Sequence, residues 1–407
     1  MSTRHLNLAE RRNPDRLWVK ITLLLVSTLT VMAGATIAPS LPAMRQHFAE
    51  VPNADYWVRL VLTAPALFIA LGAPIAGTII DRFGRKGWLA LSVFLYGFAG
   101  SSGFLLNEIG WILVGRVLLG LSVAGIMTTA TTLIADYYLG SARAQFLGLQ
   151  AAFMGLGGVV FLTLVGFLAD LNWRYPFLIY LVAWLFLPLI LLVLPEPIRA
   201  QSGSASSETA VSESVPWRLL IVTYGIALVA QIVFYMIPVQ LPFFLQELTG
   251  ANASQIGVAI ALATLATSLS ALSYQRLKAR STFTGVYEIA FGLMGIGYLA
   301  IGKAQNYGMV LVSLAIAGLG IGLLMPNMTV CLTSSTPALF RGRILGGLTT
   351  SFFLGQFISP LVSQPLSQRL GLADTYGLAG GLMLAMLAIT LGVMTYWHRL
   401  GHRQRSL

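Results

Sequence analysis

The chain of 407 residues contains about a dozen apolar stretches, each close to 20 residues long. A helix of about 20 apolar residues spans the hydrocarbon core of a bilayer, and these stretches lack the alternation of apolar and polar residues that is typical of barrel strands. We therefore predict an all-α polytopic membrane protein with twelve transmembrane helices. The predicted spans are residues 18–38, 56–79, 87–106, 111–134, 145–168, 175–194, 217–245, 254–275, 283–302, 307–332, 342–367 and 375–397.

The composition agrees with a surface that faces lipid. Apolar residues make up 57% of the chain and charged residues 10%, whereas a soluble domain carries about 25% charged residues. The net charge of +11 would suit nucleic acid, but no stretch combines clustered basic residues with a soluble module, so no nucleic-acid partner is expected. The single cysteine, Cys331, excludes an intrachain disulfide and a CxxC metal site. No cofactor and no metal site are predicted.

The distribution of basic residues predicts the orientation in the membrane. With both termini on one side, 19 of the 25 Lys and Arg residues lie on that side, five lie on the other, and Arg116 lies within a helix. Basic residues accumulate in cytoplasmic loops. We therefore expect both termini to be cytoplasmic and the protein to reside in a plasma membrane, as in the bacterial inner membrane.

A polar linker near the middle of the chain predicts two halves. Residues 195–216 separate a half at 18–194 from a half at 217–397, with cytoplasmic tails at 1–17 and 398–407. An internal repeat supports this division: a shift of 198 residues superimposes Gly120, Leu121, Met127, Arg143, Gly148 and Gly157 on Gly318, Leu319, Met325, Arg341, Gly346 and Gly355. Two parallel, pseudo-symmetric six-helix halves around a central cavity are a transporter design.

The loop between the second and third predicted spans carries the densest pattern of charged residues. It reads Gly77-Thr-Ile-Ile-Asp81-Arg82-Phe-Gly84-Arg85-Lys86. Its glycines permit a tight turn, and Asp81 can pair with the nearby cations or accept backbone N–H groups at a helix start.

This pattern resembles the signature loop G-x-x-x-D-R-x-G-R-K/R of the major facilitator superfamily, and the resemblance covers essentially the whole chain. It implies alternating access by rocking of the two halves, with the signature loop as a cytoplasmic latch. In that family an acidic residue at the inner end of the fourth helix completes a charge relay, and Asp136 occupies this place here. The resemblance thus implies that Asp81, Arg85 and Asp136 hold the cytoplasmic side closed.

Two further charged residues are candidates for proton coupling. The segment from Gly115 to Ala124 resembles a second motif of the family, R-x-x-x-G-x-x-x-A, whose arginine, here Arg116, is linked to proton movement. A structural arginine that bonds to backbone carbonyls of neighbouring spans is the alternative. Glu288 lies about five residues into the ninth span, where it could either carry a proton or reach the membrane surface and pair with nearby basic residues. These are Arg276, Lys278 and Arg280.

The fifth predicted span departs from the antiporter pattern of the same family, G-x-x-x-G-P-x-x-G-G. Between Gly157 and Gly166 the Gly-Pro pair is absent, and the 198-residue shift places Ser359 and Pro360 of the eleventh span at the corresponding position. The first span also has no acidic residue. Membership of the superfamily is therefore better supported than antiport.

The first, fourth, seventh and tenth spans line the pathway in such a bundle. Polar and soft side chains on these spans and on the eleventh are the candidates for a substrate cavity, namely Met127, Thr128, Gln231, Phe234, Tyr235, Met325, Asn327 and Gln356. Met and aromatic groups with few fixed charges suit apolar or amphipathic compounds better than sugars or phosphates. Ordinary helix packing is the alternative explanation of each of these residues.

These patterns together predict a secondary transporter that acts as a monomer. We expect an exporter of lipophilic or cationic small molecules, coupled to proton exchange. The alternatives are an exporter or permease for a specific metabolite, siderophore or lipid, with another coupling ion or none, and a membrane sensor without transport activity. An enzyme is not expected, because the four histidines lie in tails and loops rather than near other catalytic side chains.

Overall fold

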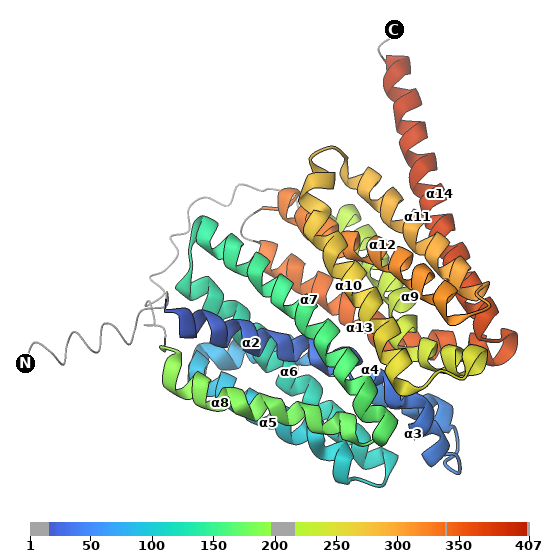
Figure 1. The fold of residues 1–407 in the computed structure, drawn as a ribbon. Helices are drawn as coiled ribbons and strands as arrows, with labels where there is room; N and C mark the ends of the chain where they lie inside the picture. The colour runs from blue at the N-terminus through green and yellow to red at the C-terminus, as the bar shows by residue number, and fades with distance from the viewer. Residues whose placement is uncertain (1–15, 197–215, 338–339, 405–407) are drawn as a thin grey trace, which may run out of the picture. The chain divides into compact units, whose positions relative to one another are not determined.

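A computed structural model describes residues 16–196, 216–337 and 340–404 (Figure 1). The side chains of Asp81, Phe83, Ala144 and residues 393–404 lie outside the description. The predicted N-terminal tail and linker therefore fall largely outside the described residues, whereas the last helix continues to Gln404, into the predicted C-terminal tail at 398–407. No strand occurs within the described ranges.

Twelve helical segments of the described chain are long and apolar enough to cross a membrane, which confirms the predicted fold class. The first span continues from α2 through a 3₁₀ turn at Ala38–Ser40 into α3, and the sixth begins with a 3₁₀ segment at Tyr175–Leu181 that leads into α8. The helices are α2 (Leu17–Ala35), α3 (Leu41–His47), α4 (Ala54–Phe83), α5 (Arg85–Leu105), α6 (Ile109–Tyr137), α7 (Gly140–Leu171), α8 (Val182–Val193), α9 (Trp217–Thr249), α10 (Ala253–Lys278), α11 (Phe283–Gly302), α12 (Tyr307–Ser334), α13 (Arg341–Leu370) and α14 (Leu372–Gln404).

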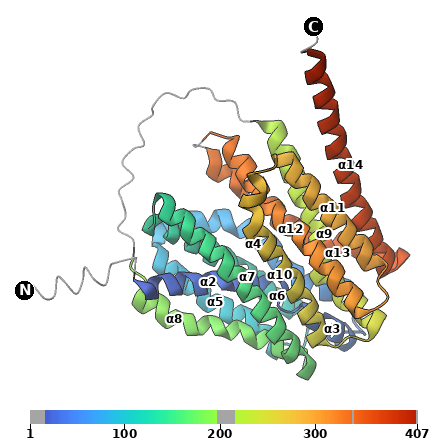
Figure 2. The ribbon, with the colours of Figure 1, turned by 45° about the horizontal axis from the view of Figure 1, so that its top comes forward.

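The helices form two compact units. The first comprises Met1–Phe161 and Leu171–Pro216, and the second comprises Leu162–Asp170 and Trp217–Leu407, so the last part of α7 groups with the second unit. In the first unit α6 packs between α4 and α5. In the second unit α12 packs against both α10 and α11, and α14 lies along α11 (Figures 1 and 2).

The internal repeat is visible in how equivalent helices pack. A Cβ atom on Gly120 would lie 2.5 Å from the carbonyl oxygen of Pro65, and one on Gly318 would lie 2.6 Å from that of Ala263. The 198-residue shift relates both the two glycines and their two partners. The crossings of α6 on α4 and of α12 on α10 therefore use the same contact, in which the absence of a side chain lets two backbones approach closely.

The surface and the polar side chains suit a lipid environment. Large apolar side chains are exposed along many spans, including Phe98, Trp111, Ile221, Val312 and Leu382. Many buried hydroxyls donate to a carbonyl one turn earlier in their own helix; those of Ser27 and Thr129, for example, donate to Leu23 and Gly125. Such bonds satisfy the hydroxyl where water is absent.

Candidate functional site

The signature loop is a single-residue break between α4 and α5. Gly84 has φ of +92°. Residues other than glycine rarely adopt this conformation, because their Cβ atom is crowded there. Gly84 separates Phe83, the last residue of α4, from Arg85, the first residue of α5. The break turns the chain so sharply that the first backbone N–H groups of α5 are open to partners from elsewhere in the unit.

Arg85 forms an ion pair with Asp136 near the end of α6. The Arg85 Nη1 atom lies 2.8 Å from Asp136 Oδ2, and both side chains are about three-quarters buried, with exposed fractions of 23% and 25%. Partial burial weakens solvent screening, so this pair is stronger than one on an open surface. The structure therefore brings together two of the three residues that the resemblance places in the charge relay.

The remaining signature residues take different positions. Asp81 lies in the last turn of α4, and its side chain is outside the described part of the structure. Arg82 is exposed and makes further interactions. Gly77 faces open space, with nothing within 4 Å of a Cβ placed on it. Lys86 is partly exposed, and its backbone, rather than its ammonium group, makes the contact described next.

Glu196 is a residue that the sequence analysis missed. Its carboxylate accepts hydrogen bonds from the backbone N–H groups of Arg85, at 2.7 Å, and Lys86, at 2.9 Å. A carboxylate at a helix start satisfies unpaired donors and interacts favourably with the helix dipole. A Cβ on Gly84 would lie 3.0 Å from Glu196 Oε1, so this glycine also leaves room for the carboxylate.

Tyr137 fixes the same segment from the other side. Its hydroxyl donates a hydrogen bond to the carbonyl of Pro195, directly before Glu196. We call Arg85, Asp136 and Glu196 the signature-loop cluster, because they join the starts or ends of α5, α6 and the segment after α8. An acidic residue directly after an apolar span, opposite a basic loop, was the available sequence signal for Glu196.

Arg116 is enclosed by the core of the first unit. Its side chain is 1% exposed; Nη1 donates to the Tyr180 hydroxyl at 3.1 Å and Nη2 to the Gly100 carbonyl at 3.2 Å. The guanidinium also lies over the rings of Phe177, at 4.6 Å, and Tyr180, at 5.0 Å. Neutral oxygens and aromatic faces thus compensate the buried charge.

Glycines on α5 make room for these rings. A Cβ on Gly100 would lie 2.4 Å from Tyr180, and one on Gly103 would lie 2.0 Å from Phe177. The bond to Gly100 matches the structural alternative for Arg116. However, the buried Nε atom has no hydrogen-bond partner among the described residues, which leaves one donor available to a mobile polar group.

Glu288 lies on α11 in the second unit. Its Oε1 atom is buried and has no hydrogen-bond partner within the described residues. One of the three predicted basic partners is engaged elsewhere: the Lys278 Nζ atom donates to the Ser281 carbonyl at 3.1 Å and lies 4.0 Å from the centre of the Phe283 ring. The described part of the chain contains no ion pair of Glu288.

The cavity candidates of the second unit are mostly held in its packing. Gln356 Nε2 donates to Gln231 Oε1 at 3.3 Å, which joins α13 to α9. Asn327 is fully buried and bonds to the Phe283 carbonyl and the Tyr274 hydroxyl. Tyr235 is buried, whereas Phe234 and Met325 are partly exposed. In the first unit, Met127 and Thr128 are partly exposed on α6.

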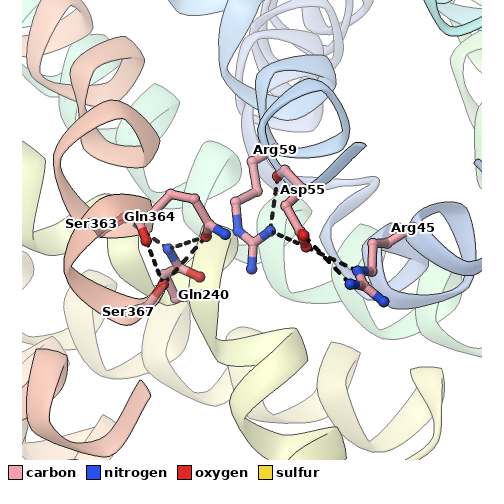
Figure 3. Close-up of polar contacts among 7 residues, drawn as sticks. All are labelled: Arg45, Asp55, Arg59, Gln240, Ser363, Gln364 and Ser367. Atoms are coloured by element: carbon pink, nitrogen blue, oxygen red, sulfur yellow. Dashed lines mark hydrogen bonds and ion pairs between the residues drawn. The ribbon is translucent and has the colours of Figure 1, made fainter. Parts of the chain in front are cut away.

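Two polar clusters at the opposite end of the spans were not predicted (Figure 3). In the first unit, Asp55 accepts from Arg45 at 2.9 Å, and Arg59, only 3% exposed, donates to the Asp55 carbonyl at 2.8 Å. In the second unit, the buried Gln240 side chain donates to Ser363 at 3.0 Å and to Gln364 at 3.2 Å. Each cluster joins two helices of its own unit.

The described residues contain no group of three or more His, Cys, Asp or Glu side chains that could hold a metal ion. The spans, the repeat and the signature-loop cluster define a polytopic membrane protein built from two similar units. Residues 23–346 and 223–405 match the family Major Facilitator Superfamily. The chain belongs to this superfamily.

Relatives within the superfamily differ in what they carry. The chain is 28% identical over 163 residues to "Niacin transporter NiaP" of Acinetobacter baylyi, which covers 40% of this chain and 36% of that one. It is 23% identical over 339 residues to "Quinolone resistance protein NorA" of Staphylococcus aureus, covering 82% and 86%. It is 25% identical over 358 residues to "Bacillibactin exporter" of Bacillus subtilis, covering 84% and 88%. The chain spans less than half the length of the first curated relatives it matches.

Solved structures show the same fold. The D-xylose-proton symporter superimposes with a TM-score of 0.74 at 15% identity, covering 90% of this chain and 96% of that one. A bacterial homologue of the human lysosomal transporter Spinster superimposes with a TM-score of 0.71 at 18% identity, covering 96% and 97%. At such identities the likeness concerns the fold alone.

Proposed function

We propose that this transporter exports lipophilic or cationic small molecules by alternating access, in exchange for protons. The observation that carries the proposal is the scarcity of buried charge: among the described residues, Arg59 and Arg116 are the charged side chains that are buried. A pathway lined by apolar, aromatic and amide groups favours substrates that need few fixed charges for recognition. The matches to NorA and the bacillibactin exporter over more than four-fifths of the chain support export.

In this proposal the signature-loop cluster is the cytoplasmic latch. The Arg85–Asp136 pair and the two N–H bonds to Glu196 hold α5, α6 and the segment after α8 in one arrangement. Movement of α5, α6 and this segment against one another requires the cluster to break, and Asp81 contributes to the same latch. Both termini are cytoplasmic, the membrane is the bacterial inner membrane, and the monomer is the working unit.

Proton coupling has two candidates in this proposal. Glu288 offers a buried carboxylate oxygen without a partner, and Arg116 offers an unused buried N–H. A carboxylate can carry the proton itself, whereas an arginine stays protonated and acts on a proton through its charge. Glu288 is therefore the proposed carrier, and Arg116 acts on a proton through a bound water within its own unit.

Export of a specific siderophore or metabolite is the second candidate function. The match to the bacillibactin exporter favours it, because that match covers as much of the chain as the match to NorA. The two candidates differ in substrate breadth: a multidrug carrier accepts unrelated lipophilic cations, and a siderophore carrier does not.

Flux into proteoliposomes with an imposed pH gradient tests the proposal. We expect several unrelated lipophilic cations to accumulate in exchange for protons, and accumulation to stop when an ionophore collapses the gradient. Glu288→Gln should abolish gradient-driven flux, whereas Glu247→Gln, on the exposed surface of α9, should not. Accumulation that is independent of the gradient, or restricted to one metabolite, would contradict proton-coupled multidrug export.

A further inference from the structure

The contact between α7 and the start of α10 has no role in the function described so far. Asp170, one residue before the end of α7, accepts hydrogen bonds from the backbone N–H of Ala253, at 2.7 Å to Oδ1, and of Ser254, at 3.2 Å to Oδ2. Both N–H groups belong to the first turn of α10. A carboxylate at the end of α7 thus accepts the unpaired backbone N–H groups at the start of α10.

The other donors at this helix start have acceptors of their own. Asn252 Oδ1 accepts from the Gln255 N–H at 3.0 Å, and Gln255 Oε1 accepts from the Asn252 N–H at 3.1 Å, which forms a capping box. A helix start exposes four unpaired N–H groups. The capping box covers two, and Asp170 covers the two between them. If Asp170 leaves, the capping box still holds the first turn together, so α10 need not fray.

Beneath this contact the two helices touch through glycine. A Cβ on Gly257 would lie 2.7 Å from the Leu162 carbonyl, and one on Gly166 would lie 2.9 Å from the Ala253 carbonyl. Backbones that meet at glycine are close but do not interlock through side chains, and they can part without any change of rotamer. The directional part of the contact is therefore the Asp170 carboxylate.

Asp170 is also suited to release. Its side chain is exposed, so water can replace it at both N–H groups and can solvate the freed carboxylate. Exposed charge at a helix start contributes only modestly to stability. An attachment of this strength can open and close during a transport cycle, whereas a fully buried ion pair would resist opening.

The position of the contact gives it a role in movement. Gly140–Phe161 of α7 belong to the first unit, whereas Leu162–Asp170 belong to the second. This end of α7 is opposite to the signature loop, because α7 begins directly after α6 ends near Asp136. Any motion of one unit against the other must bend α7 or release its Asp170 end.

We propose that Asp170 is a releasable clamp that ties the far end of α7 to α10, and that its release accompanies opening of the transporter at the end opposite the signature loop. This inference rests on the proposed alternating access and adds to it a second latch, at the other end of the spans. The clamp consists of Asp170 and the N–H groups of Ala253 and Ser254.

Hydrogen exchange of the purified full chain tests the clamp itself. In Asp170→Asn the amide oxygen accepts one bond and carries no charge, so we expect the amides of Ala253 and Ser254 to exchange about threefold to tenfold faster. Asp170→Glu should retain most of the protection. Asp374→Asn is the matched control, because Asp374 is an exposed acid in the first turn of α14 in the same unit. Unchanged exchange in Asp170→Asn would overturn the clamp.

A distance measurement tests the link to opening. Spin labels at the exposed positions Leu171 and Gln246, in a Cys331→Ser background, report on this end of the molecule. We expect the ratio of open to closed populations to rise about threefold to tenfold in Asp170→Asn and to stay unchanged in Asp374→Asn. Faster exchange without any change in label distances would overturn the role in opening.

These measurements separate the clamp from the proposed function. They need no substrate, so a distance shift in Asp170→Asn together with no flux of any drug-like compound would leave the clamp standing and remove the export proposal. Proton-driven flux together with unchanged distances would do the reverse.

Discussion

The two units share their helix packing, but one buries a charged side chain at a position where the other buries an apolar one. In the first unit α6 carries Arg116, held by the Gly100 carbonyl and two aromatic rings. The 198-residue shift places Leu314 of α12 at the equivalent position, where it is fully buried, and places Tyr298 at the position of Gly100. A charged side chain beside a glycine in one unit is thus replaced by a leucine beside a large ring in the other.

Other features have counterparts in both units. Tyr96 of the first unit donates to the Leu29 carbonyl on the first span. Tyr298 of the second unit, about one helical turn after the position that the repeat assigns to Tyr96, donates to the Val233 carbonyl on the seventh span. Each tyrosine also lies near a second one, Tyr180 or Tyr376. The glycine crossings are repeated as well. Packing is therefore shared between the units, whereas the buried charge distinguishes them.

Introducing the charge into the second unit should have the largest effect. In Leu314→Arg a guanidinium enters a site where the ring of Tyr298 stands in place of the glycine beside Arg116, and a buried Arg in a membrane costs at least about 2.5 kcal/mol. We expect loss of monodisperse protein by size exclusion and a melting temperature well below that of wild type. Leu314→Met is the control and should be nearly neutral. A stable, monodisperse Leu314→Arg protein would show that the second unit already solvates charge.

Substitution of the repeated glycines by alanine should cause the next largest loss of stability. The loss should be equal in the two units. Gly120→Ala and Gly318→Ala each place a methyl group against a backbone carbonyl, which costs about 1–3 kcal/mol. Thermal unfolding in detergent measures the loss. Gly148→Ala and Gly346→Ala are repeat-related controls, because nothing lies within 4 Å of either added carbon. Unequal losses would mean that the two crossings are not equivalent.

Removing the charge from the first unit should affect transport more than stability. Arg116→Leu leaves the Tyr180 hydroxyl without its donor, a loss of about 1–3 kcal/mol, and should abolish flux. Arg116→Lys keeps the charge but loses the planar fork, so partial flux is expected. Proteoliposome flux and thermal unfolding together measure both effects. Full flux in Arg116→Leu would assign Arg116 to packing alone.

The smallest effect should come from the shared tyrosine bonds. Tyr96→Phe and Tyr298→Phe each remove one hydrogen bond to a carbonyl that already belongs to a helix, worth about 0.5–1.5 kcal/mol. Equal shifts of the melting temperature would show that the two bonds contribute equally, although the repeat does not align the two tyrosines. A much larger loss in Tyr96→Phe would indicate that Tyr96 also supports Arg116 through Tyr180.

The fold was predictable because it depends on patterns that are local in sequence. Apolar stretches near 20 residues gave the spans, and the shift that relates Gly120 to Gly318 gave the repeat. The partners of Glu196 and Asp170 were not predictable, even where the acidic residue itself has a sequence signal, since each carboxylate bonds to backbone N–H groups far away in the chain. Backbone donors leave no trace in residue type, so a sequence pattern cannot indicate such a partner.

The residues that surround Arg116 could not be predicted from the sequence either. Gly100 and Gly103 were not singled out, because glycine in a membrane span is common and its partner rings come from a different helix. Arg116 itself was found because charge is rare in a span, whereas the equally buried Arg59 was counted among the loop residues. Position near a predicted span end concealed its burial.

The glycine beside Arg116 has a consequence for how such sequences vary. A tyrosine at position 100 would collide with Tyr180. It can therefore be accommodated only if Arg116 and the aromatic rings that pack over its guanidinium are replaced at the same time. The second unit, with Leu314 and Tyr298, is a natural example of that double exchange. Among homologues we expect positions 100 and 116 to covary: chains that keep the arginine should keep glycine, and chains that lose it should admit larger residues.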